Sequence, residues 1–415
     1  MNYVLRHMFS SLKHRNFRIY VAGQFVSLIG TWMQQLATSW MVYRLTHAPV
    51  WLGISMFSSQ IPMFALGLFG GVYVDRVNRH KLLMWTQSLS AVQALALAVL
   101  TFTHLINLYE LIGLNLVLGT IKAFDMPARQ TFVVELISAD REDLPNAIAL
   151  NSSVMNGTRL IGPAIAGLTI GLFGEGVCFL LNALSYLAVL VALMMMRVER
   201  SKLKIPHGKL IESFRDGYHA AFKNEVIRTI LLLLAFLSLV GMPYMTLLPA
   251  IAGQIPGGGA STLGMITGTG AAGALLGALY LARKGSPILG RVAAVSGIIF
   301  SVALIALGFT QRIELVLFLS FFAGLGMLLE MSSCNTMIQA MVPDEKRGRV
   351  MSFFTFSLLG VAPFGSLLIG AVAQRIGIEQ TLLLNGGLSL VGALVFLKHS
   401  ERINQRISAR IEVAA

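Results

Sequence analysis

Charged residues are scarce in this sequence. They make up 12% of its 415 residues, whereas hydrophobic residues make up 55% and the mean hydropathy is +0.73. A soluble domain needs charged side chains over its surface, so this composition excludes one. The apolar residues come in blocks of about 20 or more, the length that crosses the hydrocarbon core of a bilayer as a helix. The sequence therefore predicts a multi-pass membrane protein, and its basic start runs into the first block without the pattern of a signal peptide.

Cysteine is nearly absent, and histidine is scattered. Cys178 and Cys334 both fall inside apolar blocks without histidines nearby, which excludes a disulfide framework and a zinc site. The eight histidines lie in loops or at the ends of blocks and share no plausible site with Ser, Asp or Glu. No loop has the glycines and the Lys-Ser or Lys-Thr pair that cradle a phosphate. We therefore expect neither an enzyme nor a metal or other cofactor, and an energy source other than ATP.

The blocks predict twelve membrane-spanning helices. With the N-terminus in the cytoplasm, almost all of the 32 Lys and Arg lie on the cytoplasmic side, the asymmetry typical of membrane proteins. The exceptions are Arg44, Arg312 and Arg375 outside, and Lys122 and Arg159 within spans. This asymmetry accounts for the net charge of +13 without nucleic acid and predicts that both termini are cytoplasmic. The expected spans are 17–44, 51–74, 81–104, 109–128, 146–172, 175–196, 226–250, 261–283, 287–309, 314–338, 350–373 and 380–398.

A charged segment divides these spans into two sets of six. It covers residues 197–225, between an N-terminal half, 1–196, and a C-terminal half, 226–415. Within it an apolar residue recurs every fourth position among Lys and Glu, which predicts an amphipathic helix on the inner membrane surface. The four apolar positions are Leu210, Phe214, Tyr218 and Phe222.

The two halves contain related stretches about half the chain apart. "GTIKAFD", ending at Asp125, corresponds to "GLGMLLE", ending at Glu330, and "LLNA" at 180–183 corresponds to "LLNG" at 383–386. An internal repeat of six spans resembles the plan of the major facilitator superfamily, whose binding site lies between the halves near the middle of the bilayer. The expected fold is thus an all-α membrane protein with twelve helices in two pseudo-symmetric halves.

The loop after the second span supports this resemblance. "GGVYVDRVNRHKL", residues 70–82, is similar to the superfamily's signature of Gly, three residues, Asp-Arg, one residue and Gly-Arg-Arg/Lys, although Asn78 replaces the second glycine and His80 one base. Asn tolerates a left-handed backbone, so we expect the turn to survive. Asp75 can accept hydrogen bonds from the N-terminus of the helix at about Val350, which would latch the halves together. The alternative is a set of ordinary loop charges. The expected gating residues are Gly71, Asp75, Arg76, Arg79 and Lys81.

Ionisable side chains within spans are candidates for function, because burying them in a bilayer is unfavourable. Lys122 and Asp125 are three residues apart and can pair on one helix, whereas Glu330 has no base three or four residues away. Desolvation disfavours the charged form of a carboxyl group, so Asp125 and Glu330 are the expected proton-coupling residues. A gating salt bridge is the alternative for both.

Polar residues form a regular stripe in the first span and shorter ones in the fourth, seventh and tenth. A polar face in lipid is unfavourable, so we expect a cavity there, with helix–helix hydrogen bonding as the alternative. Methionines suit a wall that adapts to a bulky ligand. The expected substrate-cavity residues are Gln24, Ser27, Thr31, Gln34, Thr38, Asn115, Lys122, Arg159, Met327 and Met331.

The fifth span contains "NGTRLIGPAIAG", residues 156–167, which is similar to the motif of antiporters in the superfamily. Gly162, Pro163 and Gly167 match the motif, and Ala166 replaces one glycine. Small residues allow close helix contact, and Pro163 permits a bend. This resemblance implies an exporter of the antiporter type rather than a symporter.

Longer stretches resemble one branch of the superfamily, which includes enterobactin exporters and macrolide efflux pumps. They are residues 125–167, 178–190 and 337–354. This resemblance implies proton-driven efflux of a bulky molecule across a bacterial cytoplasmic (inner) membrane. The bases Arg159 and Lys122 favour an anion such as a siderophore. Multidrug or macrolide efflux is the first alternative and a non-transporting membrane receptor the second. We expect a monomer whose partners are substrate, protons and lipid; an outer-membrane channel partner stays open.

Overall fold

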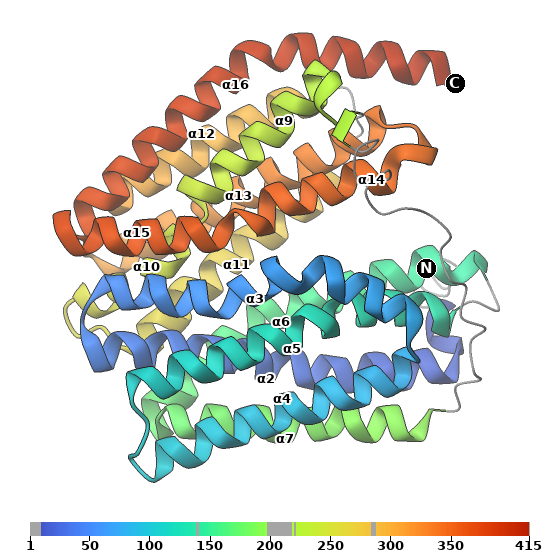
Figure 1. Ribbon diagram of the computed structural model, residues 1–415. Coiled ribbons are helices and arrows are strands. Elements are labelled where there is room, and N and C mark those ends of the chain that lie inside the picture. The colour runs from blue at the N-terminus through green and yellow to red at the C-terminus, as the bar shows by residue number, and fades with distance from the viewer. Residues whose placement is uncertain (1–9, 138–140, 197–217, 220, 284–287, 415) are drawn as a thin grey trace, which may run out of the picture. The chain divides into compact units, whose positions relative to one another are not determined.

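The computed structural model describes residues 10–137, 141–196, 218–219, 221–283 and 288–414. All regular structure in these ranges is helical (Figure 1). The chain divides into two compact units. Unit 1 comprises Met1–Thr46, Ser58–Pro206 and Gly259–Gly264, and unit 2 comprises His47–Phe57, His207–Gly258 and Met265–Ala415.

Unit 1 is built around the first long helix. Helix α2 packs most extensively against α7 and α6, while α4 packs against α7 and α5. A core of large apolar side chains, including Phe17, Tyr20 and Phe132, is fully buried among them. The helices are α2 (Arg15–Thr46), α3 (Pro49–Arg76), α4 (Arg79–Phe102), α5 (Leu108–Leu136), α6 (Leu144–Phe173) and α7 (Glu175–Met195), with the short 3-10 helices η1 (Ser10–Lys13) and η2 (Arg141–Asp143). Residues 49–57 of α3 are counted with unit 2, and residues 260–264, the start of α11, with unit 1.

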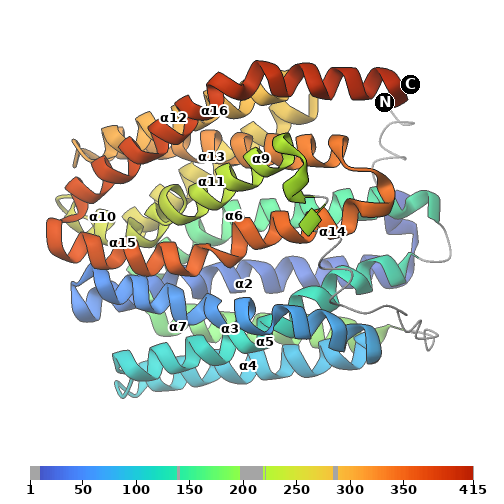
Figure 2. The same cartoon turned by 45° about the horizontal axis from the view of Figure 1, so that its top comes forward.

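Unit 2 is organised around α12 and contains two π-helical segments. Helix α12 packs most extensively against α13 and α16, which lie beside it in both views (Figures 1 and 2). The helices are α9 (Glu225–Phe236), α10 (Tyr244–Gln254), α11 (Ala260–Arg283), α12 (Leu289–Leu307), α13 (Ile313–Met341), α14 (Asp344–Thr355), α15 (Ala362–Ile376) and α16 (Ile378–Ala414). The π-helices η3 (Leu237–Gly241) and η5 (Phe356–Gly360) join α9 to α10 and α14 to α15.

Matching turns occur in the two units, as an internal repeat predicts. Gly174 ends α6 with φ of 81°, and Gly377 ends α15 with φ of 88°. In each case the glycine N–H donates to the carbonyl four residues back, and a side chain at this φ would strain the backbone. The helix that follows each glycine carries an asparagine bonded to the first long segment of its unit. Asn182 donates to Gln34 Oε1 at 2.7 Å, and Asn385 donates to the Val240 carbonyl at 2.8 Å.

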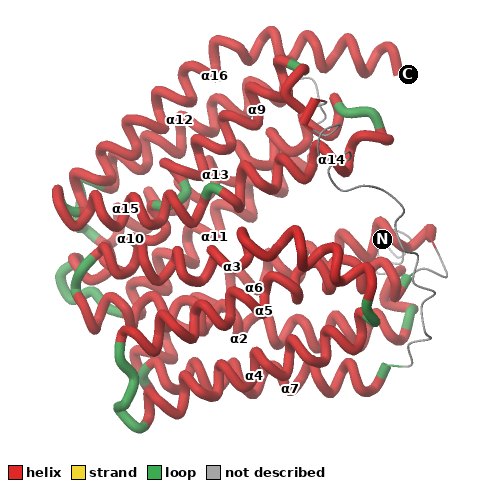
Figure 3. The backbone as a smooth tube through the Cα atoms, viewed as in Figure 1, coloured by secondary structure: helices red, strands yellow, loops and turns green. Residues whose placement is uncertain are grey.

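Ten helical segments of the described chain are long and apolar enough to cross a membrane. They include the composite segments Glu225–Gln254 and Lys346–Ile376, where a π-helix joins two α-helices. Helices α2 and α6, which coincide with the first and fifth expected spans, are not among the ten. Figure 3 shows that short loops connect most of these helices. Twelve spans therefore stay a prediction.

Two expected boundaries are wrong. Helix α5 continues to Leu136 instead of ending near residue 128, and α16 continues to Ala414 instead of residue 398. The extension of α16 buries Ile403 and Ile407, so packing rather than lipid sustains it. The expected amphipathic helix at 197–225 lies mostly outside the described residues, although Tyr218 stacks on Phe222 with ring centroids 4.7 Å apart.

Candidate functional site

A buried hydrogen-bond cluster surrounds Asp125 in unit 1. Asp125 is 7% exposed and accepts from Thr86 Oγ1 at 2.6 Å and from Gln87 Nε2 at 2.7 Å, both on α4. Arg129, one turn further along α5, donates from Nε to the other carboxylate oxygen and pairs with it. The carboxylate therefore has three donors, one of them a permanent cation.

Arg129 links this cluster to α2 by donating from Nη1 to Gln24 Oε1. Arg129 was not predicted as a site residue, because the expected fourth span ends at residue 128 and this base then falls among the cytoplasmic charges. Its four-residue spacing from Asp125 was the available signal, since residues i and i+4 are neighbours on a helix. The expected pairing of Lys122 with Asp125 is not formed: no ion pair or hydrogen bond joins Lys122 to any described residue.

Glu330 in unit 2 has a very different environment. It is 3% exposed on α13, and its Oε2 has no hydrogen-bond partner among the described residues. The carboxyl group lies against Gly297 of α12. A Cβ added to Gly297 would stand 3.1 Å from the carboxyl carbon of Glu330 and 3.1 Å from its Oε1. The same Cβ would stand 3.1 Å from Ala393 of α16. The carboxyl group thus lies in the interior of unit 2, where α12 and α16 meet α13.

The other predicted intramembrane base, Arg159, lies next to α2. Its guanidinium carbon is 5.7 Å from the centroid of the Trp32 ring, a cation–π arrangement. Gly162, one turn along α6, lies so close to the same tryptophan that an added Cβ would come within 2.5 Å of Trp32 Cβ. Gly162 and Pro163 of the antiporter-type motif are buried in α6 together with Gly167. Small residues thus allow α6 to approach α2 as the motif implies.

The polar stripe of α2 is buried within unit 1 and serves two kinds of contact. Gln34 donates to Gln93 Oε1 of α4 at 3.0 Å and accepts from Asn182 of α7, so it bonds helices together, the alternative left open by the sequence. Nearer the start of α2, Gln24 Nε2 and Ser27 Oγ are buried without a partner in the described part of the chain. The remaining stripe residues are Thr31, whose hydroxyl donates to the Ser27 carbonyl, and Thr38, which is 7% exposed.

The other expected cavity residues lie on the helices predicted for them. Asn115 is buried on α5, and Met327 is buried on α13. Met331, one turn after Met327, packs against the core of unit 2. Their roles in a substrate cavity stay predictions.

The charged loop after α3 adopts a capped helix start. Asn78 has φ of −69° and ψ of 112°, and its side chain accepts from the Lys81 N–H at 2.9 Å. The expected left-handed turn is therefore wrong: Asn78 serves as the N-cap of α4, for which asparagine is well suited. His80 Nε2 donates to the Leu193 carbonyl at 2.9 Å, and Arg79 lies 3.6 Å from Glu135 of α5.

The expected gate stays a prediction. The side chain of Asp75 lies outside the described residues, so the contact proposed for it is untested. A Cβ on Gly71 would meet nothing within 4 Å, and Arg76 is exposed at the end of α3. Neither residue adds a contact to the latch.

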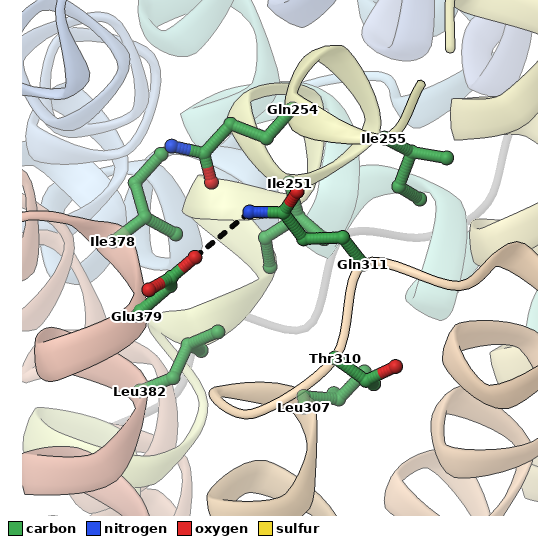
Figure 4. A pocket seen from close by; sticks show the side chains of 9 residues that line it. All are labelled: Ile251, Gln254, Ile255, Leu307, Thr310, Gln311, Ile378, Glu379 and Leu382. Carbon is green, nitrogen blue, oxygen red and sulfur yellow. Dashed lines mark hydrogen bonds between the residues drawn. The ribbon is translucent and has the colours of Figure 1, made fainter. Parts of the chain in front are cut away.

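A small hollow lies between the ends of α10, α12 and α16 in unit 2 (Figure 4). Gln311 donates to Glu379 Oε1 across it at 2.8 Å. Its lining residues are Ile251, Gln254, Ile255, Leu307, Thr310, Gln311, Ile378, Glu379 and Leu382. None of them belongs to the predicted cavity or coupling set.

A comparison with models of protein families identifies the family of the chain. A model described as transmembrane secretion effector matches residues 7–410. The chain belongs to this family of the major facilitator superfamily. The family resemblance predicted from the motifs is thereby confirmed.

Curated relatives agree with the family assignment. The chain is 26% identical to a staphyloferrin A transporter from Staphylococcus aureus, over 95% of this chain and 98% of the relative. It is 23% identical to macrolide efflux protein A from Streptococcus pyogenes, over 90% and 93%, and 23% identical to the enterobactin exporter EntS from Shigella boydii, over 92% of each. The protein is thus a multi-pass membrane transporter and not an enzyme.

Solved structures support the fold. The nucleoside transporter NupG superimposes with a TM-score of 0.73 at 13% identity, over 92% of this chain and 98% of that one. A bacterial homologue of the iron transporter ferroportin in an inward-facing state gives 0.70 at 14% identity, over 94% and 98%. At this identity the likeness concerns the fold alone.

Proposed function

We propose that this transporter is a proton-driven antiporter that exports a bulky, anionic small molecule such as a siderophore. It works as a monomer in the bacterial cytoplasmic membrane with both termini in the cytoplasm. Twelve spans in two halves rock about a central site, and proton binding restores the state that accepts substrate. Helices α2 and α6, of 32 and 30 residues, are long enough to supply the two spans beyond the ten apolar segments.

The proposal that the substrate is an anion rests on the balance of charges inside unit 1. Arg129 already neutralises Asp125, so the positive charge of Lys122 has no ion-pair partner among the described residues. Arg159 on α6 adds a second base at the α2 face. A cationic drug would need an acid available to it, whereas a carboxylate or catecholate would find two bases. Two relatives are named for the transport of staphyloferrin A and the export of enterobactin.

Macrolide efflux is the second candidate. Met327 and Met331 give α13 flexible apolar side chains one turn apart, which suit a bulky apolar ligand. A relative named for macrolide efflux matches most of the chain. This candidate predicts that the bases of unit 1 are dispensable for transport.

Transport into proteoliposomes under an imposed pH gradient tests the proposal. Wild type should accumulate a catecholate siderophore uphill and leave a macrolide unmoved. Lys122→Gln should reduce siderophore transport at least tenfold, because a buried base paired to substrate is worth several kcal/mol. Lys223→Gln, which removes an exposed base outside the spans, is the matched control. Uphill movement of the macrolide alone, unaffected by Lys122→Gln, would establish the second candidate instead.

A further inference from the structure

We propose that Glu330 is, among the described residues, the proton-binding carboxyl group of the transport cycle and that Asp125 is a positioning residue that holds Arg129. The inference rests on the proposed proton-driven export and divides between these two acids the role that the sequence assigns to both. It follows from the contrast between their surroundings.

Asp125 is surrounded by three hydrogen-bond donors. A carboxyl group that accepts from a guanidinium, a hydroxyl and an amide would lose favourable contacts if one oxygen became an O–H. Protonation would also leave Arg129 as an unpaired cation beside Gln24 within the helix bundle, and an unpaired buried charge is costly. The physical role of Asp125 is thus to fix the position of Arg129.

Glu330 lacks every one of these partners. No hydrogen bond or ion pair joins it to a described residue, and its carboxyl group lies against Gly297, which carries no charge. Cys334, one turn along α13, takes the place relative to Glu330 that Arg129 takes relative to Asp125. A proton added at Oε2 removes the charge without displacing any donor, so this group binds and releases a proton at the smallest structural cost.

The titratable groups on the helices packed around Glu330 lie too far away to compensate it. On α12 the ionisable residue is Arg291, an exposed side chain six residues before Gly297 and so about 9 Å along the axis. On α16 the nearest are Lys398 and His399, exposed and beyond Ala393 by five and six residues, or about 8–9 Å.

The other helices near Glu330 also carry their ionisable residues far from it along the chain. The first turns of α9 carry Glu225 and Arg228, the end of α11 carries Tyr280 and Arg283, and the charges of α14 precede its apolar half. On α13 itself, Glu314 lies sixteen residues from Glu330, near the opposite end of the helix. Apart from the Cys334 thiol, one turn along α13, no titratable group of these described helices lies close to Glu330 along the helix axes.

A single coupling group sets the stoichiometry. With the membrane potential clamped at zero, one proton per substrate limits accumulation to about tenfold for each pH unit, whereas two protons permit about a hundredfold. We expect wild type and the double variant Asp125→Asn/Arg129→Gln to reach the same tenfold limit. The double variant removes both charges together and so avoids stranding Arg129. Glu330→Gln should only equilibrate the probe, a catecholate siderophore.

Infrared difference spectroscopy on the protein in liposomes tests the assignment without any substrate. A protonated-carboxyl band that persists above about pH 6, where ordinary Asp and Glu side chains are ionised, should be present in wild type and in Asp125→Asn/Arg129→Gln, and absent in Glu330→Gln. Persistence of this band in Glu330→Gln, or its loss in the double variant, would overturn the inference. Failure of the siderophore to accumulate in wild type while the band follows the expected pattern would overturn the proposed function and leave the proton site standing.

Discussion

Asp125 in unit 1 and Glu330 in unit 2 occupy corresponding places in the two halves of the sequence, yet their surroundings differ in nearly every respect. Asp125 accepts from Thr86, Gln87 and Arg129, whereas Glu330 has no bonding partner among the described residues and lies against Gly297. The comparison shows that a repeat conserves helix positions while neighbouring side chains decide chemistry. One position, arginine in α5 and cysteine in α13, accounts for most of the difference in charge.

The largest expected effect comes from removing the carboxylate that neutralises Arg129 in unit 1. Asp125→Ala leaves Arg129 buried without its carboxylate, which should lower the stability of the protein by about 3–5 kcal/mol. Thermal unfolding of the purified protein in detergent measures this loss. Asp125→Asn/Arg129→Gln should recover most of it, and a double variant as unstable as Asp125→Ala would contradict the pairing.

Crowding the carboxyl group of unit 2 should have the next largest effect. Gly297→Ala places a methyl group 3.1 Å from the Glu330 carboxyl and from Ala393, so one of them must shift, at a cost of about 1–3 kcal/mol. Thermal unfolding should show the loss, and proton-driven accumulation should fall with it. Gly387→Ala on α16, where an added Cβ meets nothing within 4 Å, is the matched control and should behave as wild type.

Asn182 in unit 1 and Asn385 in unit 2 allow a second comparison, between the hydrogen bonds that each asparagine makes in its unit. Asn182→Leu removes the donor to Gln34, a side chain that also bonds Gln93, and should cost about 1–3 kcal/mol. Asn385→Leu removes a donor to the single carbonyl of Val240 and should cost about 1 kcal/mol. Paired unfolding curves measure both losses, and equal losses would show that the network of unit 1 adds nothing beyond one bond.

The smallest effects concern the ends of the units that lie outside the spans. Lys13 Nζ donates to Asp143 at 2.7 Å, and His14 at 2.9 Å; with Ser10 these hydrogen bonds hold the pKa of Asp143 well below its usual 3.8. A depressed pKa stabilises the folded state fully above pH 3.8, and the stabilisation is lost as the pH falls through the lower folded value.

Asp143→Asn should therefore reduce stability at pH 7 by about 1 kcal/mol. The loss should shrink progressively once the pH falls below 4, as seen in melting temperatures measured across the pH range. In unit 2, Glu225→Gln removes a half-exposed pair with Arg406 and should change stability by less than about 1 kcal/mol. A larger loss for Glu225→Gln than for Asp143→Asn would reverse this ranking.

Much of the fold was predictable from local sequence. Most helices follow the expected apolar blocks within a few residues, because a helix that crosses a bilayer must satisfy its backbone internally and present apolar side chains to lipid. The exceptions, α5 and α16, continue past the apolar blocks because side chains pack against neighbouring helices there. Hydropathy carries no information about such contacts.

The sequence by itself determined the class of the protein, its helical character and its family, since composition, hydropathy and motif spacing are properties of the chain. Only the tertiary structure decided the fate of the charged residues. In it Asp125 pairs with Arg129 instead of Lys122, Asn78 serves as a helix cap, and Glu330 has no hydrogen-bond or ion-pair partner among the described residues. The physical reason is that the donors Thr86 and Gln87 come from another helix, and electrostatic energy depends on distances between groups that sequence spacing does not specify.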